Sequence, residues 1–222
     1  MKDSSGASID AAVSTLGLAL PCQAREKLTA YLALLAKWNA TYNLTAIRDI
    51  NEMVSHHLLD SLSIARYIKP GRLLDVGSGG GLPGVPLAIW GESCLPGLHV
   101  TVLDANHKKA AFLRQVKIDL TLANLEVCGE RVESWKPEQR YDQIVSRAFS
   151  DLSEFFQLTR HLGAPRIAGG AEGARWLAMK GVHPHEEIHN LAPPCVLEQV
   201  ARLKVPGLDA ERHLVVMRAA DA

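Results

Sequence analysis

The chain contains the stretch Leu73-Leu74-Asp75-Val76-Gly77-Ser78-Gly79-Gly80-Gly81-Leu82-Pro83-Gly84, an apolar run that ends in an acid and continues into closely spaced glycines. Glycine has no Cβ and tolerates positive φ, so such a turn lets the backbone pass close to a ligand. A helix that begins there directs its first N–H groups at the polar end of the ligand. The stretch therefore predicts a strand, a ligand-binding turn and a helix.

A second apolar run, His99–Leu103, also ends in an acid, Asp104. An acid at the end of the next strand, about 20 residues after the glycines, is where an α/β sheet binds the hydroxyl pair of a ribose. Asp75, the glycine turn and Asp104 together predict a site for a cofactor that contains a nucleoside.

Two cofactors compete for this site. The G-x-G-x-x-G pattern of a nicotinamide dinucleotide fails from Gly77, because Leu82 stands sixth, and from Gly79 it fits only with two residues inserted after the strand. The Asp75 carboxylate would repel a pyrophosphate, and Pro83 lacks an N–H. S-adenosylmethionine has no phosphate, and its ammonium and sulfonium attract Asp75 directly or through water. The residues favour S-adenosylmethionine over a dinucleotide and over a turn without a ligand.

Composition excludes several classes of protein. Lys+Arg and Asp+Glu number 24 each, so any contact with nucleic acid must come from a local basic patch. No segment approaches the roughly 18 consecutive apolar residues of a membrane span, and acids flank the start of the run Ala11–Leu20, which argues against an export signal. The four cysteines form no C-x-x-C pair. We therefore expect a cytoplasmic protein with reduced thiols.

The first part of the chain, residues 1–70, is predicted to be a helical appendage that precedes a second domain, residues 71–222. Apolar residues share one helical face at Leu28, Tyr31, Leu32, Leu35 and Trp38. We expect a break at Asn39–Asn43, a second helix over Asn51–Tyr67 with Asn51 as its cap, and a junction at Pro70-Gly71.

The second part alternates apolar runs with helical stretches, as a parallel sheet requires. Strands are expected at Leu73–Val76, Val100–Leu103, Leu125–Cys128, Gln143–Ser146 and Trp176–Met179, with helices near 85–90, 108–120 and 152–162. Two late strands, Val196–Leu203 and His213–Arg218, are joined by a short turn and suit an antiparallel hairpin. The predicted fold class is α/β, a Rossmann-like parallel sheet with a terminal antiparallel hairpin and an N-terminal helical appendage.

Separated blocks between about Leu28 and Val216 match one family in order and spacing: Lys37-Trp38-Asn39 with Tyr42-Asn43-Leu44-Thr45, His57 with Asp60-Ser61-Leu62, residues 75–84, Ser146-Arg147-Ala148-Phe149, Met179-Lys180-Gly181, and Glu211-Arg212-His213-Leu214-Val215-Val216. The chain resembles the bacterial small-subunit ribosomal RNA guanine-N7 methyltransferases, also called the glucose-inhibited division protein B family. The resemblance implies a class I S-adenosylmethionine-dependent methyltransferase. Its substrate would be N7 of guanine 527 in 16S ribosomal RNA, free or in the small ribosomal subunit, and we expect a monomer.

The family's site residues carry over to matching positions. The sequence pattern itself predicts that Asp75, Gly79, Gly81 and Asp104 bind the cofactor. The resemblance adds Gly77, Leu82, Val132, Glu133 and Arg147 to the cofactor contacts, and it implies an RNA-binding cluster of Arg131, Arg147, Lys180 and Arg212. His56 stands where relatives are expected to carry Arg, so a phosphate contact there would depend on pH.

No catalytic acid or base is expected. Guanine N7 offers a lone pair at neutral pH, so transfer needs alignment and fixed dipoles and no proton removal. Arg147 is the candidate for positioning the substrate, through guanine O6 or a phosphate, and Phe149 could stack on a base. Cys195 follows Pro194, but it is far in sequence from the strand at Gln143–Ser146, which argues against a cysteine nucleophile.

Other polar features have simpler interpretations. His57 and Asp60, three residues apart on one helix, are expected to pair and to hold the appendage on the core, and Trp38 and Tyr42 are expected in the core. The run His185–His189 matches the H-E-x-x-H pattern of zinc proteases, but it is predicted to be a short surface helix without a metal. The alternatives left open are a methyltransferase of another RNA or of a protein, and a nucleoside-binding module without turnover.

Overall fold

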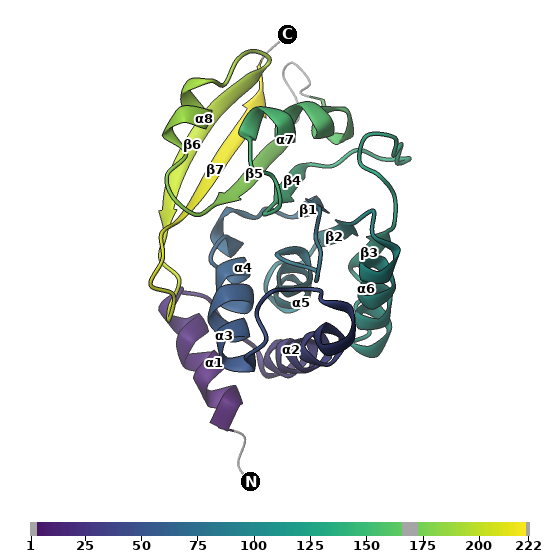
Figure 1. Ribbon diagram of the computed structural model, residues 1–222, viewed down its shortest axis with the longest axis vertical. Helices are drawn as coiled ribbons and strands as arrows, with labels where there is room; N and C mark the ends of the chain where they lie inside the picture. The colour runs from purple at the N-terminus through teal and green to yellow at the C-terminus, as the bar shows by residue number, and fades with distance from the viewer. Residues whose placement is uncertain (1–3, 166–172, 221–222) are drawn as a thin grey trace.

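The computed structural model describes residues 4–165 and 173–220, and within them seven strands form one sheet (Figure 1). The order across the sheet is β3-β2-β1-β4-β5-β7-β6. The bounds are β1 Gly71–Val76, β2 Leu98–Leu103, β3 Leu125–Cys128, β4 Gln143–Ser146, β5 Arg175–Lys180, β6 Cys195–Leu203 and β7 Arg212–Ala219. The first five strands run parallel, and β7 lies antiparallel to both β5 and β6. The predicted strands and the terminal hairpin are therefore confirmed.

Strand order reverses between β1 and β4. From β1 the chain moves outward through β2 to β3, then returns to β4 on the other side of β1 and continues to β5. The loops that follow β1 and β4 consequently diverge and leave a crevice at the carboxyl edge of the sheet, which is where α/β sheets bind ligands. The glycine turn that follows β1 lies at this point.

The sheet is covered on both faces, because alternate residues of each strand point to opposite sides. Leu73 belongs to one buried cluster and Leu74 to the other. The first cluster contains the N-terminal helices together with α5 (Gly84–Cys94) and α6 (His107–Asp119). The second contains α7 (Leu152–Thr159) and the inward side chains of the hairpin. None of the described helices is long and apolar enough to cross a membrane.

The N-terminal segment is helical, as expected, but its elements end elsewhere. Helix α1 spans Ser4–Thr15 and α2 spans Cys22–Tyr42, so the break predicted from Asn39 is wrong. The Asn39 side chain is buried; its Nδ2 donates to Ile47 O, and its Oδ1 accepts from Thr45 N. Asn39 therefore lies inside helix α2, and its side chain stabilises the loop that follows the helix. The helix ends at Asn43, whose φ is 50°.

The second predicted helix is divided into short pieces. Helix α3 (Ile50–Met53) leads into a π-helical turn over Val54–Leu59, then α4 (Asp60–Leu62) and a 3₁₀ turn over Ala65–Tyr67. Asn51 is not its cap: Asp49 precedes the helix and accepts a hydrogen bond from the Asn51 N–H. The cap therefore lies two residues before the predicted one, because the extended backbone of Asp49, at φ −74° and ψ 125°, lets its carboxylate reach the Asn51 N–H.

Helix α2 contacts the glycine turn through a buried hydrogen bond. The buried Tyr31 hydroxyl donates a 2.6 Å hydrogen bond to Gly80 O, across 49 residues of sequence. Burial raises the pKa of this phenol far above its ordinary value, so the hydroxyl stays a donor at every physiological pH. The turn therefore has one carbonyl that depends on the N-terminal helices.

We expect Tyr31→Phe to lower the free energy of unfolding by about 1–3 kcal/mol, because it leaves the buried Gly80 carbonyl without its donor. Tyr42→Phe is the matched control, since Tyr42 is 44% exposed at the end of the same helix. Chemical denaturation of the three proteins measures the difference. Equal stability of the two variants would contradict the assigned support.

Candidate active site at the carboxyl edge of the sheet

The turn after β1 needs its glycines. Gly77, Gly79 and Gly81 have φ of +71°, +59° and +94°, which L side chains rarely adopt. A Cβ on Gly81 would lie 2.5 Å from Val85 Cγ2, and one on Gly77 would lie 2.9 Å from Ala148 Cβ. The turn therefore packs closely on α5 on one side and on the loop after β4 on the other.

Asp75 lies beneath this turn, fully buried. Its Oδ2 accepts a 2.8 Å hydrogen bond from the Gly84 N–H at the start of α5, whose positive dipole end favours a carboxylate. Burial is the larger effect and raises the pKa of Asp75 to about 7, while the Gly84 hydrogen bond opposes it. Asp75 Oδ1 and the nearby Ser78 Oγ are buried without a hydrogen-bond partner among the described residues.

Asp104 joins the ends of β1 and β2, as its position predicted. Its Oδ2 accepts from the Gly79 N–H at 2.9 Å, and its Oδ1 accepts from the Asn106 N–H at 2.8 Å. Lys109 Nζ lies 3.8 Å from the same carboxylate. Each carboxylate oxygen can accept a second hydrogen bond, so the side chain can still receive a pair of hydroxyls.

These residues fit a nucleoside cofactor with a cationic end. Unmet acceptors lie beneath the turn, at Asp75 and Ser78, and a carboxylate able to accept further hydroxyls lies beside it. Leu82 is 5% exposed, and its N–H is used inside the turn, by Ser78 O, so any contact from Leu82 must be through its side chain or carbonyl.

The predicted residues after β3 lie on a short turn. Ser134 and Trp135 both donate N–H groups to Arg131 O, which holds Val132 and Glu133 at the bend. Val132 is half-buried against the second core cluster, whereas Arg131 and Glu133 are exposed. This turn follows β3 at the same edge of the sheet as Asp104.

The loop after β4 connects the turn to a cationic cavity. Ser146 Oγ donates to Val76 O at 2.7 Å, which fixes the following Arg147 beside the glycine turn. The cavity has a volume of about 360 Å³ and is lined by Ile47, His56, His57, Asp60, Arg147, Met179, Lys180, Gly181 and Arg212. Three members of the predicted RNA-binding cluster therefore converge; the fourth, Arg131, does not line this cavity.

One buried carboxylate holds two of these cations. Asp60 is 1% exposed; its Oδ2 lies 2.9 Å from Arg147 Nη1, and its Oδ1 lies 3.0 Å from Arg212 Nε. The Arg147 Nη1 also donates to His56 O at 3.1 Å. The carboxylate thus links the N-terminal helices to the end of β4 and the start of β7.

The predicted pairing of His57 with Asp60 is wrong. His57 Nε2 shares a 2.8 Å hydrogen bond with Thr45 Oγ1 instead. His57 lies in the π-helical turn and Asp60 begins α4. In a π-helix, residues three apart no longer face each other as they do in an α-helix. Burial, followed by the Arg147 charge, lowers the pKa of His57 to about 4, so this imidazole is neutral at pH 7.

Lys180 is held by the segment that resembled a zinc helix. Its Nζ lies 2.7 Å from Glu187 Oε2 and donates to Ser150 O and Phe149 O. The same Glu187 oxygen accepts from the Leu152 N–H at the start of α7. The short helix α8 (His185–His189) is present as predicted, and its glutamate positions a cation. Sequence reasoning missed this role, because nothing in the H-E-x-x-H pattern indicates the partner of Glu187.

Two further expectations concern Cys195 and the aromatic pair. Cys195 is buried in β6, where burial raises the pKa of its thiol to about 11, and this agrees with the argument against a nucleophile. Trp38 packs against Phe112 and the first core cluster, as predicted. Tyr42 was expected in the core but is exposed, because it stands at the last helical position.

The raised pKa of Asp75 predicts how the stability of the protein changes with pH. The folded state keeps the proton up to about pH 7, whereas the unfolded chain releases it near pH 4, so stability is lost as pH rises through this window. Asp75→Asn keeps an acceptor for Gly84 and has no proton to lose. We expect the wild type to lose about 4 kcal/mol relative to the variant between about pH 4 and pH 8. Parallel pH profiles of unfolding free energy would contradict the raised pKa.

Comparisons with known proteins agree with this geometry. The sequence pattern of one family, described as rRNA small subunit methyltransferase G, matches residues 24–215. The chain is 54% identical over 204 residues to the ribosomal RNA small subunit methyltransferase G of Pseudomonas aeruginosa, covering 91% of this chain and 90% of that protein. It is 55% identical over 193 residues to the protein of the same name from Chromobacterium violaceum, covering 86% and 87%.

Solved structures agree in fold. A putative methyltransferase from Escherichia coli superposes with a TM-score of 0.53 at 16% identity, covering 74% of this chain and 87% of that one. A ribosomal protein L11 methylase from Lactobacillus delbrueckii superposes with a TM-score of 0.52 at 13% identity, covering 73% and 77%. The sheet is therefore that of a Rossmann-like class I methyltransferase, and the chain belongs to the rRNA small subunit methyltransferase G family.

Proposed function

We propose that this protein transfers a methyl group from S-adenosylmethionine to N7 of guanine 527 in the 16S RNA of the small ribosomal subunit, acting as a monomer in the cytoplasm. The observation that carries the proposal is the convergence of Arg147, Lys180 and Arg212 on one cavity, immediately beside a glycine turn fit for a nucleoside. Membership of the family supports the nature of the substrate.

Each part of the cofactor has residues suited to it. Asp104 would accept the ribose hydroxyls, and the backbone at Gly77, Gly79 and Gly81 would leave room for the methionine end. Val132 and Glu133 would flank the adenine, with Leu82 and Arg147 closing the site. Asp75 would act from beneath the turn, directly or through water, since its Oδ1 is unpartnered and a positive charge nearby favours the ionised carboxylate. The bound cofactor supplies a methyl group activated by the sulfonium.

The RNA would be held by cations. Arg147, Lys180 and Arg212, with Arg131 at the neighbouring turn, would contact phosphates and the target base. Arg147 uses one nitrogen, Nη1, for Asp60 and His56 O, so its other donors can reach a phosphate or guanine O6. Phe149 is half-buried and packs on Phe155, with ring centroids 5.2 Å apart, which leaves it an exposed portion for a base.

The chemistry requires alignment rather than proton transfer. Asp60 is fully engaged by two guanidinium groups, and His57 is neutral and bonded to Thr45. Neither is needed as a base, since guanine N7 attacks with a lone pair that carries no proton. The protein accelerates transfer by fixing the base against the methyl donor and by holding fixed cations around the reacting atoms.

The decisive experiment uses small subunits from a strain lacking this protein, incubated with the protein and labelled S-adenosylmethionine. We expect label on N7 of guanine 527. Parallel reactions with protein-free 16S RNA, an assembly intermediate and the intact subunit identify the form that is methylated. Label on another RNA or on a protein would reassign the substrate. Calorimetric binding of S-adenosylhomocysteine without any transfer would indicate a binding module.

Arg147→Ala tests the positioning role. We expect methyl transfer to fall by about 100-fold, because the aligning donor is lost, while the affinity for S-adenosylhomocysteine changes by less than about fivefold. Arg66→Ala is the control, since Arg66 is exposed and its side chain makes no hydrogen bond or ion pair with the described residues, its guanidinium lying 5.9 Å from the centre of the Tyr67 ring. Equal losses of transfer and of cofactor binding would refute an RNA-facing role for Arg147.

A further inference from the structure

The Lys180 ammonium uses all its hydrogen-bond donors within the protein. Its Nζ lies 2.7 Å from Glu187 Oε2, and it donates to Ser150 O at 2.8 Å and to Phe149 O at 3.2 Å. An ammonium group has three donors, so these three contacts engage every one of them. While they hold, the charge of Lys180 attracts RNA, but its hydrogen bonds act on its own chain.

The two carbonyls that Lys180 binds belong to the segment between β4 and α7, residues 147–151, which we call the β4–α7 loop. This loop carries Arg147 and Phe149, the two side chains proposed to meet the guanine. At its start, the Ala148 N–H donates to Ser146 Oγ at 3.1 Å. Beyond that point Lys180 holds the carbonyls of the next two residues. The placement of both base-facing side chains therefore depends on Lys180.

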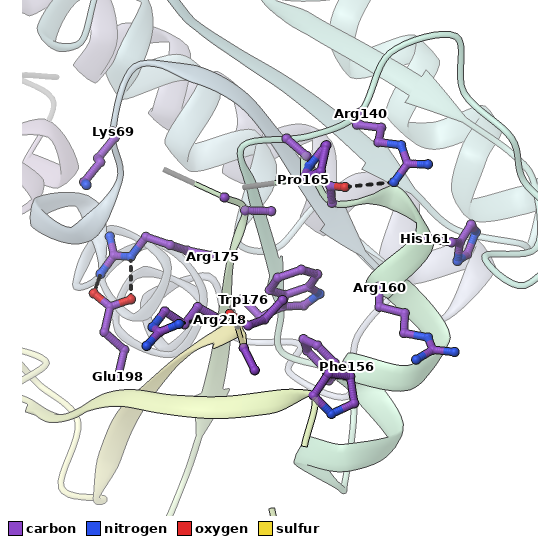
Figure 2. A pocket seen from close by; sticks show the side chains of 17 residues that line it. Lys69, Arg140, Phe156, Arg160, His161, Pro165, Arg175, Trp176, Glu198 and Arg218 are labelled. Carbon is purple, nitrogen blue, oxygen red and sulfur yellow. Dashed lines mark hydrogen bonds and ion pairs between the residues drawn. The ribbon is translucent and has the colours of Figure 1, made fainter. Parts of the chain in front are cut away.

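Glu187 joins Lys180 to the helix that follows the loop. The oxygen that contacts Lys180, Oε2, also accepts a 2.9 Å hydrogen bond from the Leu152 N–H, the first of α7. The helix dipole favours a carboxylate at this position. Helix α7 is fixed on β5 in turn, since the Phe156 and Trp176 rings pack with their centroids 4.7 Å apart (Figure 2). One oxygen atom thus links the end of β5 to the start of α7.

Glu187 can affect the substrate only through these contacts. The described residues that line the cationic cavity include Lys180 but not Glu187, which lies on α8. A carboxylate beside a lysine weakens the attraction of that lysine for phosphate, so the pair does not serve anion binding. What the pair does provide is a fixed geometry for the β4–α7 loop.

We propose that Glu187 is a positioning residue for methyl transfer. It acts through Lys180 and the start of α7 to hold the β4–α7 loop, and with it Arg147 and Phe149, in the arrangement that aligns the guanine. The inference rests on the proposed function, because it concerns how the same site aligns its substrate. It gives the segment that resembles a zinc-protease helix a role in the reaction without a metal.

Three substitutions of Glu187 separate its geometry from its charge. Glu187→Ala removes the carboxylate, and Glu187→Asp keeps the charge but is one CH₂ too short to bridge Lys180 and the Leu152 N–H. Glu187→Gln loses the charge but keeps an oxygen that can accept both hydrogen bonds. Glu198→Ala is the matched control, because Glu198 pairs with Arg175 at the other end of the same strand, β5 (Figure 2).

The measurements are kcat and KM with small subunits, affinity for S-adenosylhomocysteine, affinity for 16S RNA at several salt concentrations, and hydrogen exchange of residues 147–152. We expect the alanine and aspartate variants to lower kcat about tenfold relative to Glu198→Ala, because a misplaced base reacts slowly. Their affinity for S-adenosylhomocysteine should change by less than about twofold. Glu187→Gln should keep most of kcat. The N–H groups of residues 147–152 should exchange faster in the alanine and aspartate variants only.

Three results would overturn the proposal. A kcat of Glu187→Ala equal to that of Glu198→Ala would do so. Tighter RNA binding by Glu187→Ala, with a steeper dependence on salt, would show that the carboxylate only masks a phosphate-binding cation. Equal losses of kcat in Glu187→Gln and Glu187→Asp would assign the effect to something other than the bridge, and this comparison stands even if the alanine variant fails to fold. A wild type that does not methylate guanine 527 would instead refute the proposed function, while hydrogen exchange would still report on the loop.

Discussion

The candidate active site depends on the two ion pairs that the Asp60 carboxylate makes. It contacts Arg147 after β4 and Arg212 at the start of β7, and it comes from the helical segment that precedes β1. A buried ion pair costs desolvation, and removing one partner leaves an uncompensated charge that costs far more. Two guanidinium groups on one carboxylate therefore hold three distant segments in a single arrangement. The same carboxylate keeps the positive charges of Arg147 and Arg212 close together when no anionic substrate is bound.

Carboxylates have different roles along the carboxyl edge of the sheet. Asp75 is fully buried and has a raised pKa, Asp104 orders the turn through two backbone N–H groups, and Glu187 holds Lys180 against the start of α7. Each is placed by a hydrogen bond to backbone or by an ion pair, so the edge is organised before any ligand binds. Preorganised charges of this kind suit a reaction that needs alignment and no proton transfer.

Sequence alone determined the α/β class, the strand order in the chain, the terminal hairpin and the glycine turn with its two acids, because these depend on local periodicity and on the backbone freedom of glycine. It also placed Arg147, Lys180 and Arg212 as site residues, although only through resemblance. The tertiary structure decided which charged side chains form ion pairs with each other. Asp60 meets Arg147 and Arg212 rather than His57, because the sheet brings together segments that lie 87 and 152 residues from Asp60 in the sequence. Glu187 lies only seven residues from Lys180, but the two belong to different elements, α8 and β5, and the turn between these elements brings them together.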